Sequence, residues 1–360
     1  MLTQADDFPV HQTPEPVAFC QTDRNFYDRY FFNGYAPDGS VFFAFAFGMY
    51  PNINIADAHF SVMRNGVQDC IHASRFLNHE RLNLAVGPVR IEVLEPLQKL
   101  RVSVALTDGI AAEIVFDGRA FPIQEPRFTH RFGSRVFMDN TRMTQNARVS
   151  GWIEVDGVRT ELPAGSVGTR DRSWGVRPLG APDAQPYAPP FKPSVFWLWT
   201  PLNFATRSVF FHVMAEASGK AWNTRAVVCE DGAGAAEALH SDDAHADVVL
   251  VPGTRHAASA VIHIPLPGRK IEVTIEPFDR FRMKGIGYRH PTWSHGMFKG
   301  ELVVERERYV LAELDLGLLE NLHTQAFSRV TLRESGRPDE VGIGTFEYSM
   351  VGAYEPLDLR

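Results

Sequence analysis

Gly168-Thr-Arg-Asp-Arg-Ser-Trp-Gly-Val-Arg177 holds three arginines, an aspartate, a tryptophan and two glycines, and it is the most chemically dense stretch of this 360-residue chain. If it is extended, alternate side chains share a face, so Arg170, Arg172 and Trp174 lie opposite Asp171 and Ser173. A guanidinium could then stack on the Trp174 indole or pair with a distant carboxylate. Asp171 is either a catalytic acid beside a ligand cavity or part of a structural ion-pair network, and residue types alone favour the network slightly.

Short strand-like runs separated by turn sequences surround this stretch on both sides. The run Val41-Phe-Phe-Ala-Phe-Ala-Phe47 is apolar at both alternate sets of positions, which predicts a strand covered on both faces. Runs 58–64 and 67–72 are joined by Asn65-Gly66, a dipeptide typical of tight hairpins. Further strands are predicted at 89–94, 100–106, 112–116, 150–155, 158–162, 194–199, 208–214, 226–228, 247–251, 260–264, 270–275, 300–305, 326–332 and 342–350.

Helical periodicity is scarce. One or two helical turns are predicted at 141–148, with Asp139 as the cap, and at 316–323. Six prolines between positions 178 and 193 exclude a helix or an inner strand, so this run is interpreted as the connection between two domains, 1–185 and 186–360. The sequence therefore predicts an all-β protein of two antiparallel barrel or sandwich units.

Composition restricts the classes of partner. The chain is 44% hydrophobic and 22% charged, with a net charge of −7, and this acidic balance disfavours nucleic acid or an anionic membrane as partner. The three cysteines, Cys20, Cys70 and Cys229, are widely spaced, which predicts a reducing, cytoplasmic location. The first twenty residues lack the pattern of a signal peptide, and the longest apolar run, 41–50, is too short to span a bilayer.

Aromatic content is high. The 26 Phe, 9 Tyr and 6 Trp exceed what an aliphatic core requires and predict a small apolar ligand as the partner. No phosphate-binding loop, dinucleotide fingerprint, zinc-protease motif or serine-hydrolase elbow occurs in the sequence. We therefore expect neither a bound cofactor nor a metal.

Four polar and aromatic clusters interrupt the hydrophobic pattern, at 27–35, 137–146, 168–177 and 285–300. Each could be structural, with tyrosine hydroxyls satisfied at a barrel rim and with His290 and His295 bonded to backbone carbonyls. A zinc site at the two histidines would need a third ligand of suitable spacing, which the sequence does not show. A β-barrel with a lined cavity would equally need this mixture of many rings and a few polar groups.

Arg170-Asp-Arg-Ser-Trp-Gly175 resembles the Arg-Asp-x-Ser-Trp-Gly signature of the hydroxyneurosporene synthase superfamily, which contains carotenoid 1,2-hydratases and, more distantly, tocopherol cyclases and Diels-Alderases. His290-Pro-Thr-Trp-Ser-His-Gly296 is similar to a run in a bacterial branch of that superfamily that has no assigned activity. The resemblance covers roughly residues 20–355. It implies two lipocalin-like β-barrels packed together, with an apolar pocket lined by both.

The resemblance also implies hydration, dehydration or cyclisation of a bulky apolar substrate, such as a terpenoid, a steroid or a polycyclic aromatic, without a cofactor. Such a site needs a carboxylic acid whose pKa is raised by burial, and ring faces that stabilise positive charge. Asp171 lies on the matched motif and Asp139 is the second acid candidate. Tyr30, His290 and His295 are candidates for relaying protons, and the candidates for holding substrate are Tyr35, Arg170, Trp174, Trp197, Trp199, Tyr288 and Trp293.

Two other functions stay open at this stage. Many lipocalin-like barrels are carriers or sensors of hydrophobic ligands and catalyse nothing, and such a protein would release its ligand unchanged. Tryptophan and aspartate content also fits a carbohydrate-active β-protein, which would show an open groove with paired carboxylates. The sequence predicts neither the substrate, nor the direction of reaction, nor the oligomeric state.

Overall fold

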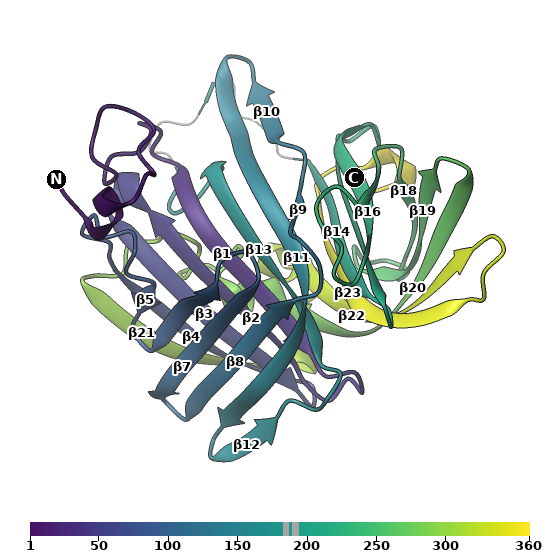
Figure 1. The fold of residues 1–360 in the computed structure, drawn as a ribbon, viewed down its shortest axis with the longest axis horizontal. Coiled ribbons are helices and arrows are strands. Elements are labelled where there is room, and N and C mark those ends of the chain that lie inside the picture. The colour runs from purple at the N-terminus through teal and green to yellow at the C-terminus, as the bar shows by residue number, and fades with distance from the viewer. Residues whose placement is uncertain (183–186, 189–193) are drawn as a thin grey trace.

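The computed structural model describes residues 1–182, 187–188 and 194–360. Over these residues the chain forms β-strands and short 3-10 turns, without an α-helix. The strands build two curled antiparallel sheets, which confirms the predicted all-β, two-part lipocalin-like architecture (Figure 1). No helix within the described ranges is long and apolar enough to cross a membrane.

The first sheet has fourteen strands in the order β21-β4-β3-β2-β1-β13-β11-β8-β7-β6-β5, with β9, β10 and β12 also paired to β11. In chain order these are β1 (Phe26–Tyr35), β2 (Phe42–Tyr50), β3 (Ile55–Arg64), β4 (Val67–Phe76), β5 (Ala85–Val86), β6 (Val89–Glu95), β7 (Lys99–Thr107), β8 (Ile110–Gly118), β9 (Ile123–Gln124), β10 (Phe128–Phe132), β11 (Arg135–Val155), β12 (Val158–Glu161), β13 (Val167–Val176) and β21 (Leu302–Val310).

The second sheet has nine strands in the order β17-β16-β15-β14-β23-β22-β20-β19-β18. They are β14 (Val195–Asn203), β15 (Arg207–Ala215), β16 (Ala221–Glu230), β17 (Leu239–Ser241), β18 (His245–Leu250), β19 (Ala257–Leu266), β20 (Arg269–Arg282), β22 (His323–Glu334) and β23 (Glu340–Val351). The 3-10 turns are η1 (Gln4–Asp7), η2 (Pro51–Ile53), η3 (Met283–Ile286), η4 (Leu311–Glu313), η5 (Leu319–Asn321) and η6 (Glu355–Leu357).

Strand β2 shows why the two sheets pack against each other. Phe43 and Phe45 point into the core of the first sheet, whereas Phe42 and Ala44 belong to a second hydrophobic cluster shared with the other sheet. All nine residues of β2 are buried, as the two apolar faces of the sequence predict. Strand β14 is its counterpart, because Leu198 packs inside the second sheet while Trp197 and Trp199 belong to the shared cluster.

The hairpin between β3 and β4 turns at Asn65-Gly66, as predicted. Arg64 pairs with Val67 across the turn, and both central residues have positive φ, +50° at Asn65 and +74° at Gly66. Asparagine and glycine tolerate this conformation better than other residues, which is why the pair marks tight hairpins.

The helix predicted at 141–148 is wrong. These residues lie in the middle of β11, which pairs with β13 on one edge and with β8 and β9 on the other. Asp139 is accordingly not a helix cap but a strand residue opposite Val176. At 316–323 the chain makes only the single 3-10 turn η5.

The second half of the chain contributes one strand to the first sheet. β21, drawn in light green in Figure 1, lies along the purple and blue strands and pairs with β4 from Leu302–Arg75 to Val310–Val67. The predicted domain boundary at 185–186 and much of the proline-rich run lie outside the described residues.

Candidate active site

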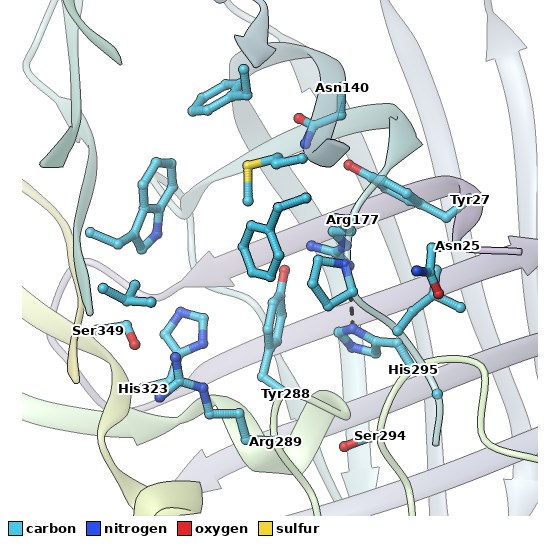
Figure 2. Close-up of a pocket in the computed structure, with 18 of the residues that line it drawn as sticks. Asn25, Tyr27, Asn140, Arg177, Tyr288, Arg289, Ser294, His295, His323 and Ser349 are labelled. Atoms are coloured by element: carbon cyan, nitrogen blue, oxygen red, sulfur yellow. Dashed lines mark hydrogen bonds between the residues drawn. The ribbon is translucent and has the colours of Figure 1, made fainter. Parts of the chain in front are cut away.

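A cavity of about 710 Å³ lies between the two sheets. Its walls come from β1, β10, β11 and β13 of the first sheet, from β14, β15, β22 and β23 of the second, and from the segments 177–182 and 287–295. This volume is typical of a site for a small organic molecule. Rings line much of it, and Figure 2 shows Tyr288 among the labelled polar residues, with His323 and Arg289 on one side and Arg177 and His295 on the other.

Asp171 projects into this cavity from β13. Its strand neighbours are Phe31 on β1 and Thr144 on β11, and only 7% of the residue is exposed. The alternation predicted for this strand is confirmed, because Arg170 and Arg172 point to the opposite face. Burial raises the pKa of Asp171 to about 6, although Arg142 works against the shift.

Arg142 is the one guanidinium that reaches Asp171 within the described chain. Its Nε lies 3.9 Å from Asp171 Oδ2, and its Nη1 lies 3.7 Å from Oε2 of the buried Glu125. It therefore divides its charge between two acids while its plane covers the rings of Phe128 and Trp197, at 5.3 and 5.1 Å from their centroids. Arg142 therefore offsets only part of the effect of burial, and the pKa of Asp171 stays above its ordinary value.

A second acid–base pair lies on the second sheet. Nε2 of His323 is 2.8 Å from Oε1 of Glu347, and Trp197 Nε1 donates to the same oxygen, while Gln325 Nε2 donates to Oε2 at 2.6 Å. Burial alone would raise the pKa of Glu347, yet its three donors hold it below the ordinary value. Because Nε2 of His323 carries a proton and donates it in a hydrogen bond to the Glu347 carboxylate, Nδ1 is the ring nitrogen left able to accept a proton.

Tyr288 is enclosed by two histidine rings, those of His295 and His323, at centroid distances of 4.5 and 4.6 Å. Nε2 of His295 is 3.0 Å from the Ile286 carbonyl oxygen and therefore carries the proton, which leaves Nδ1 to accept from Arg177 at 3.3 Å. Burial holds the pKa of His295 well below its ordinary value. His295 is thus a neutral ring that orients Arg177.

Among the buried polar atoms of the cavity wall that lack a hydrogen-bond partner within the described residues, two belong to uncharged side chains of the first sheet. They are the hydroxyl of Tyr27 on β1 and Oδ1 of Asn140 on β11. Both residues are at least 96% buried and both border the cavity. An unpaired buried polar group is costly, so these atoms are natural contacts for a polar group on a ligand.

Five of the residues predicted from the sequence line the cavity: Asp171, Trp197, Trp199, Tyr288 and His295. The remaining seven do not. Asp139 forms a two-point ion pair with the exposed Arg127, at 2.6 and 2.8 Å. Tyr35 lies where the sheets meet and accepts a hydrogen bond from Asn203.

Tyr30, Arg170 and Trp174 lie on the face of the first sheet turned away from the cavity. Tyr30 packs on the first core beneath the guanidinium of Arg172, which is 3.7 Å from its ring centroid. Arg170 Nε donates to Gln145 Oε1 at 2.6 Å. Trp174 is 41% exposed. The stacking of a guanidinium group that the sequence predicted on its indole is found instead between Arg172 and Tyr30.

His290 and Trp293 belong to a separate buried cluster on the first sheet. His290 Nε2 is 2.8 Å from Oε2 of Glu307, and Nε2 of His72 is 3.3 Å from the same oxygen, so three groups with the spacing of metal ligands meet there. However, His290 Nδ1 accepts the backbone N–H groups of Thr292 and Trp293. A neutral His290 therefore carries its proton on Nε2 and donates to Glu307, whereas a metal-bound histidine normally donates through its other nitrogen.

His323 and Glu347 are site residues that the sequence did not indicate. Both stand in ordinary strands, and they meet because β22 pairs with β23 so that Gln325 faces Glu347. Arg142 and Tyr27 lie inside two of the polar and aromatic clusters found in the sequence. Nothing in the sequence distinguished them from their neighbours as residues of a site.

The fold recurs in solved structures of low sequence identity. A Nitrosomonas europaea protein provisionally named AttH matches with a TM-score of 0.51 at 13% identity, over 94% of this chain and 98% of its own. CghA matches with a TM-score of 0.55 at 11% identity, over 91% and 89%. Kievitone hydratase from Nectria haematococca matches with a TM-score of 0.51 at 12% identity, over 89% and 88%. At these identities the likeness shows a shared fold.

Comparisons at the level of sequence identify the family of the chain. A search of curated proteins finds no match. A family model, described as a family of unknown function (DUF8625), matches residues 2–360. Because that match spans nearly the whole sequence, the chain belongs to the family DUF8625.

Proposed function

We propose that this protein is a cofactor-independent enzyme of the hydratase, dehydratase or cyclase type, acting by acid–base chemistry on a bulky apolar substrate. The observation that carries the proposal is Asp171, a carboxyl group with a raised pKa on the wall of an aromatic cavity of about 710 Å³. A buried acid of this kind stays largely protonated up to about pH 6 and can deliver a proton to carbon. The name of one protein of similar fold, kievitone hydratase, is compatible with this class of chemistry.

In the hydration direction, protonated Asp171 transfers its proton to one carbon of an alkene. The adjacent carbon becomes cationic, and the nearby ring faces of Trp197 and Trp199 stabilise it by about 0.5–2 kcal/mol each. Water adds to the cation and loses a proton to His323 Nδ1, which Glu347 orients through Nε2. Dehydration is the reverse sequence, and in a cyclisation an internal π-bond replaces the water. General acid or base assistance is typically worth about 10²–10⁴-fold in rate.

Extraction of apolar metabolites from the native cells, followed by incubation with the protein and mass spectrometry, tests the proposal. We expect a product heavier or lighter than its substrate by one water, or isobaric with it for a cyclisation. In D₂O the hydration product should carry one deuterium on carbon. Asp171→Asn should abolish turnover, and Asp139→Asn is the matched control, since that carboxylate pairs with Arg127 outside the cavity.

A carrier or sensor predicts a different result. It would release a single ligand, unchanged after incubation, and Asp171→Asn would alter affinity without altering any product. That outcome would replace the enzymatic proposal. We also propose a cytoplasmic location, since Cys20, Cys70 and Cys229 are all free thiols and a reducing compartment suits them.

A further inference from the structure

Three arginines gather around Tyr288 without a carboxylate partner. Arg29 comes from β1, Arg177 directly follows β13, and Arg289 directly follows Tyr288 in the chain. The guanidinium carbons of Arg29 and Arg177 lie 4.6 and 5.8 Å from the Tyr288 ring centroid. Among the described residues no carboxylate oxygen lies within 4.0 Å of any of the three guanidinium groups, whereas the buried Arg119 and Arg207 each pair with one.

Arg29 and Arg289 have buried guanidinium nitrogens that no hydrogen bond uses within the described chain. Arg29 is 1% exposed, and its Nε and Nη1 have no partner, while Nη2 makes only a long contact of 3.5 Å to the Ile286 carbonyl oxygen. Nη1 of Arg289 is also buried without a partner in the described chain. Arg177 reaches the neutral ring of His295. A buried guanidinium without a counter-charge is unfavourable, which implies that an anion joins it.

The neighbouring acids do not supply this counter-charge at close range. Asp57 accepts from the Tyr50 hydroxyl at 3.0 Å and from the backbone N–H of Gly296 at 2.7 Å. Glu347 is occupied by Trp197, His323 and Gln325, and Asp171 faces Arg142. Burial lowers the pKa of Arg289.

The backbone at Arg289 adopts a left-handed conformation. Its φ is +54°, in the left-handed region that residues other than glycine rarely occupy. Such strain persists where the surrounding structure imposes it, and it is common at ligand sites. In Figure 2 the head group of Arg289 lies beside His323, on the opposite side of Tyr288 from Arg177.

We propose that Arg289, with the positive charges of Arg177 and Arg29 near the same tyrosine adding to the local potential, forms a carboxylate-binding subsite in this cavity. The inference rests on the proposed function and narrows its substrate to an apolar, ring-bearing acid. Arg177 and Arg289 both line the cavity, and a planar guanidinium matches a carboxylate with two parallel hydrogen bonds. The apolar remainder of the substrate then lies along the aromatic wall that carries Asp171.

A pair of probes that differ only in charge tests the subsite. Pyrene-1-butyrate and pyrene-1-butanol share a ring system and chain length, and their affinity for the full chain can be measured by fluorescence titration. We expect the acid to bind at least about tenfold more tightly than the alcohol, because charge-assisted hydrogen bonds exceed neutral ones by roughly that factor. The preference should shrink as salt is added, since the subsite borders an open cavity.

Substitutions of Arg289 test whether this residue causes the preference for the acid over the alcohol. Arg289→Met should lower the affinity for the acid to that for the alcohol and leave the affinity for the alcohol within about twofold. Arg289→Gly should do the same, and because glycine accepts a positive φ without strain it provides a variant that folds if the methionine variant does not. Arg333→Met is the matched control, since Arg333 is an exposed arginine paired with Asp339 on the far hairpin.

The possible outcomes separate this inference from the proposed function. Equal affinity of the wild-type protein for the two probes would overturn the carboxylate subsite and leave the apolar cavity standing. A preference for the acid that survives in both Arg289 variants would also overturn it. Failure of both probes to bind would contradict the apolar cavity itself and the subsite with it.

Discussion

His323 and Glu347 form a hydrogen bond of 2.8 Å between Nε2 and Oε1, and this bond joins neighbouring strands at the cavity wall. The same carboxylate accepts from Trp197 on β14, so one acid holds side chains from three adjacent strands of the second sheet. The pair fixes the histidine tautomer and the position of an indole at once. It thereby links the stability of the cavity wall to the proposed chemistry.

Replacing Glu347 by Gln should lower the free energy of unfolding by about 1–3 kcal/mol. The new amide N–H₂ faces the N–H₂ of Gln325, and one buried donor then loses its acceptor. The double variant Glu347→Gln, Gln325→Glu restores one donor and one acceptor and should recover most of the loss. Denaturant unfolding of the four proteins forms a double-mutant cycle, and an additive result would contradict the direct bond.

Asp171 should destabilise the fold as pH rises. Its pKa is about 6 in the fold against 3.8 for an ordinary aspartate, so folding favours the protonated form and stability is lost between pH 4 and pH 6. Asp171→Asn, which stays neutral, should match the wild type near pH 4 and exceed it by about 1–3 kcal/mol at pH 7.5. Thermal or urea unfolding across this range measures the difference, and a variant less stable at pH 7.5 would identify Asp171 as architecture.

The rate of turnover should depend on the protonation state of Asp171. If Asp171 donates a proton, kcat/KM is greatest below pH 6 and falls about tenfold per pH unit above it, because the acid form disappears. A rate that instead rises through pH 6 would assign Asp171 the role of a base. Either profile should be absent from the residual activity of Asp171→Asn.

Gly287→Ala should disturb the cavity through its backbone. Gly287 has a φ of +86°, and an added Cβ would lie 2.8 Å from His295 Cδ2 and 2.8 Å from His59 Nε2. We expect a loss of about 2 kcal/mol or more, together with weaker ligand binding as Tyr288 and His295 shift. Gly336→Ala is the control, since Gly336 has a φ of +82° but nothing within 4 Å, and it should cost only about 1 kcal/mol.

His72 should make the protein sensitive to acid. Burial lowers the pKa of His72 to about 4 from 6.5, so the unfolded chain binds the proton first and stability is lost as pH falls from 6.5 to 4. Once His72 is fully protonated, the total loss of folding free energy from this pKa shift is about 3 kcal/mol. His72→Gln should therefore flatten the pH dependence of unfolding in this window, and an unchanged slope would show that other histidines dominate.

Local patterns in the sequence predict most strands because they record short-range physics. The two apolar faces of β2 and the Asn65-Gly66 turn are properties of adjacent residues, and both are confirmed. The run 141–148 has no such clear pattern, and its conformation is decided by strands on both edges of β11. Those partners lie as far away as Asp117 and Trp174, beyond the reach of periodicity.

The candidate site was predictable only in part for the same reason. The alternation of β13 correctly separates Asp171 from Arg170 and Arg172, because facing is fixed within one strand. Whether a strand residue then meets a cavity depends on how the sheets pack, and Trp174 and Asp139 fall on the wrong side of that arrangement. The pairing of His323 with Glu347 depends on the register of β22 and β23, which no single strand reveals.

The position of β21 has a consequence for how the chain is made. β4 has no outer neighbour until Leu302–Val310 has emerged from the ribosome, so the amino-terminal half waits with an unsatisfied strand edge during most of synthesis. At about 5–20 residues per second, some 230 further residues correspond to roughly 10–50 seconds of exposure. A chain that stops before Leu302 would therefore leave β4 as an open sheet edge, available for pairing with another molecule.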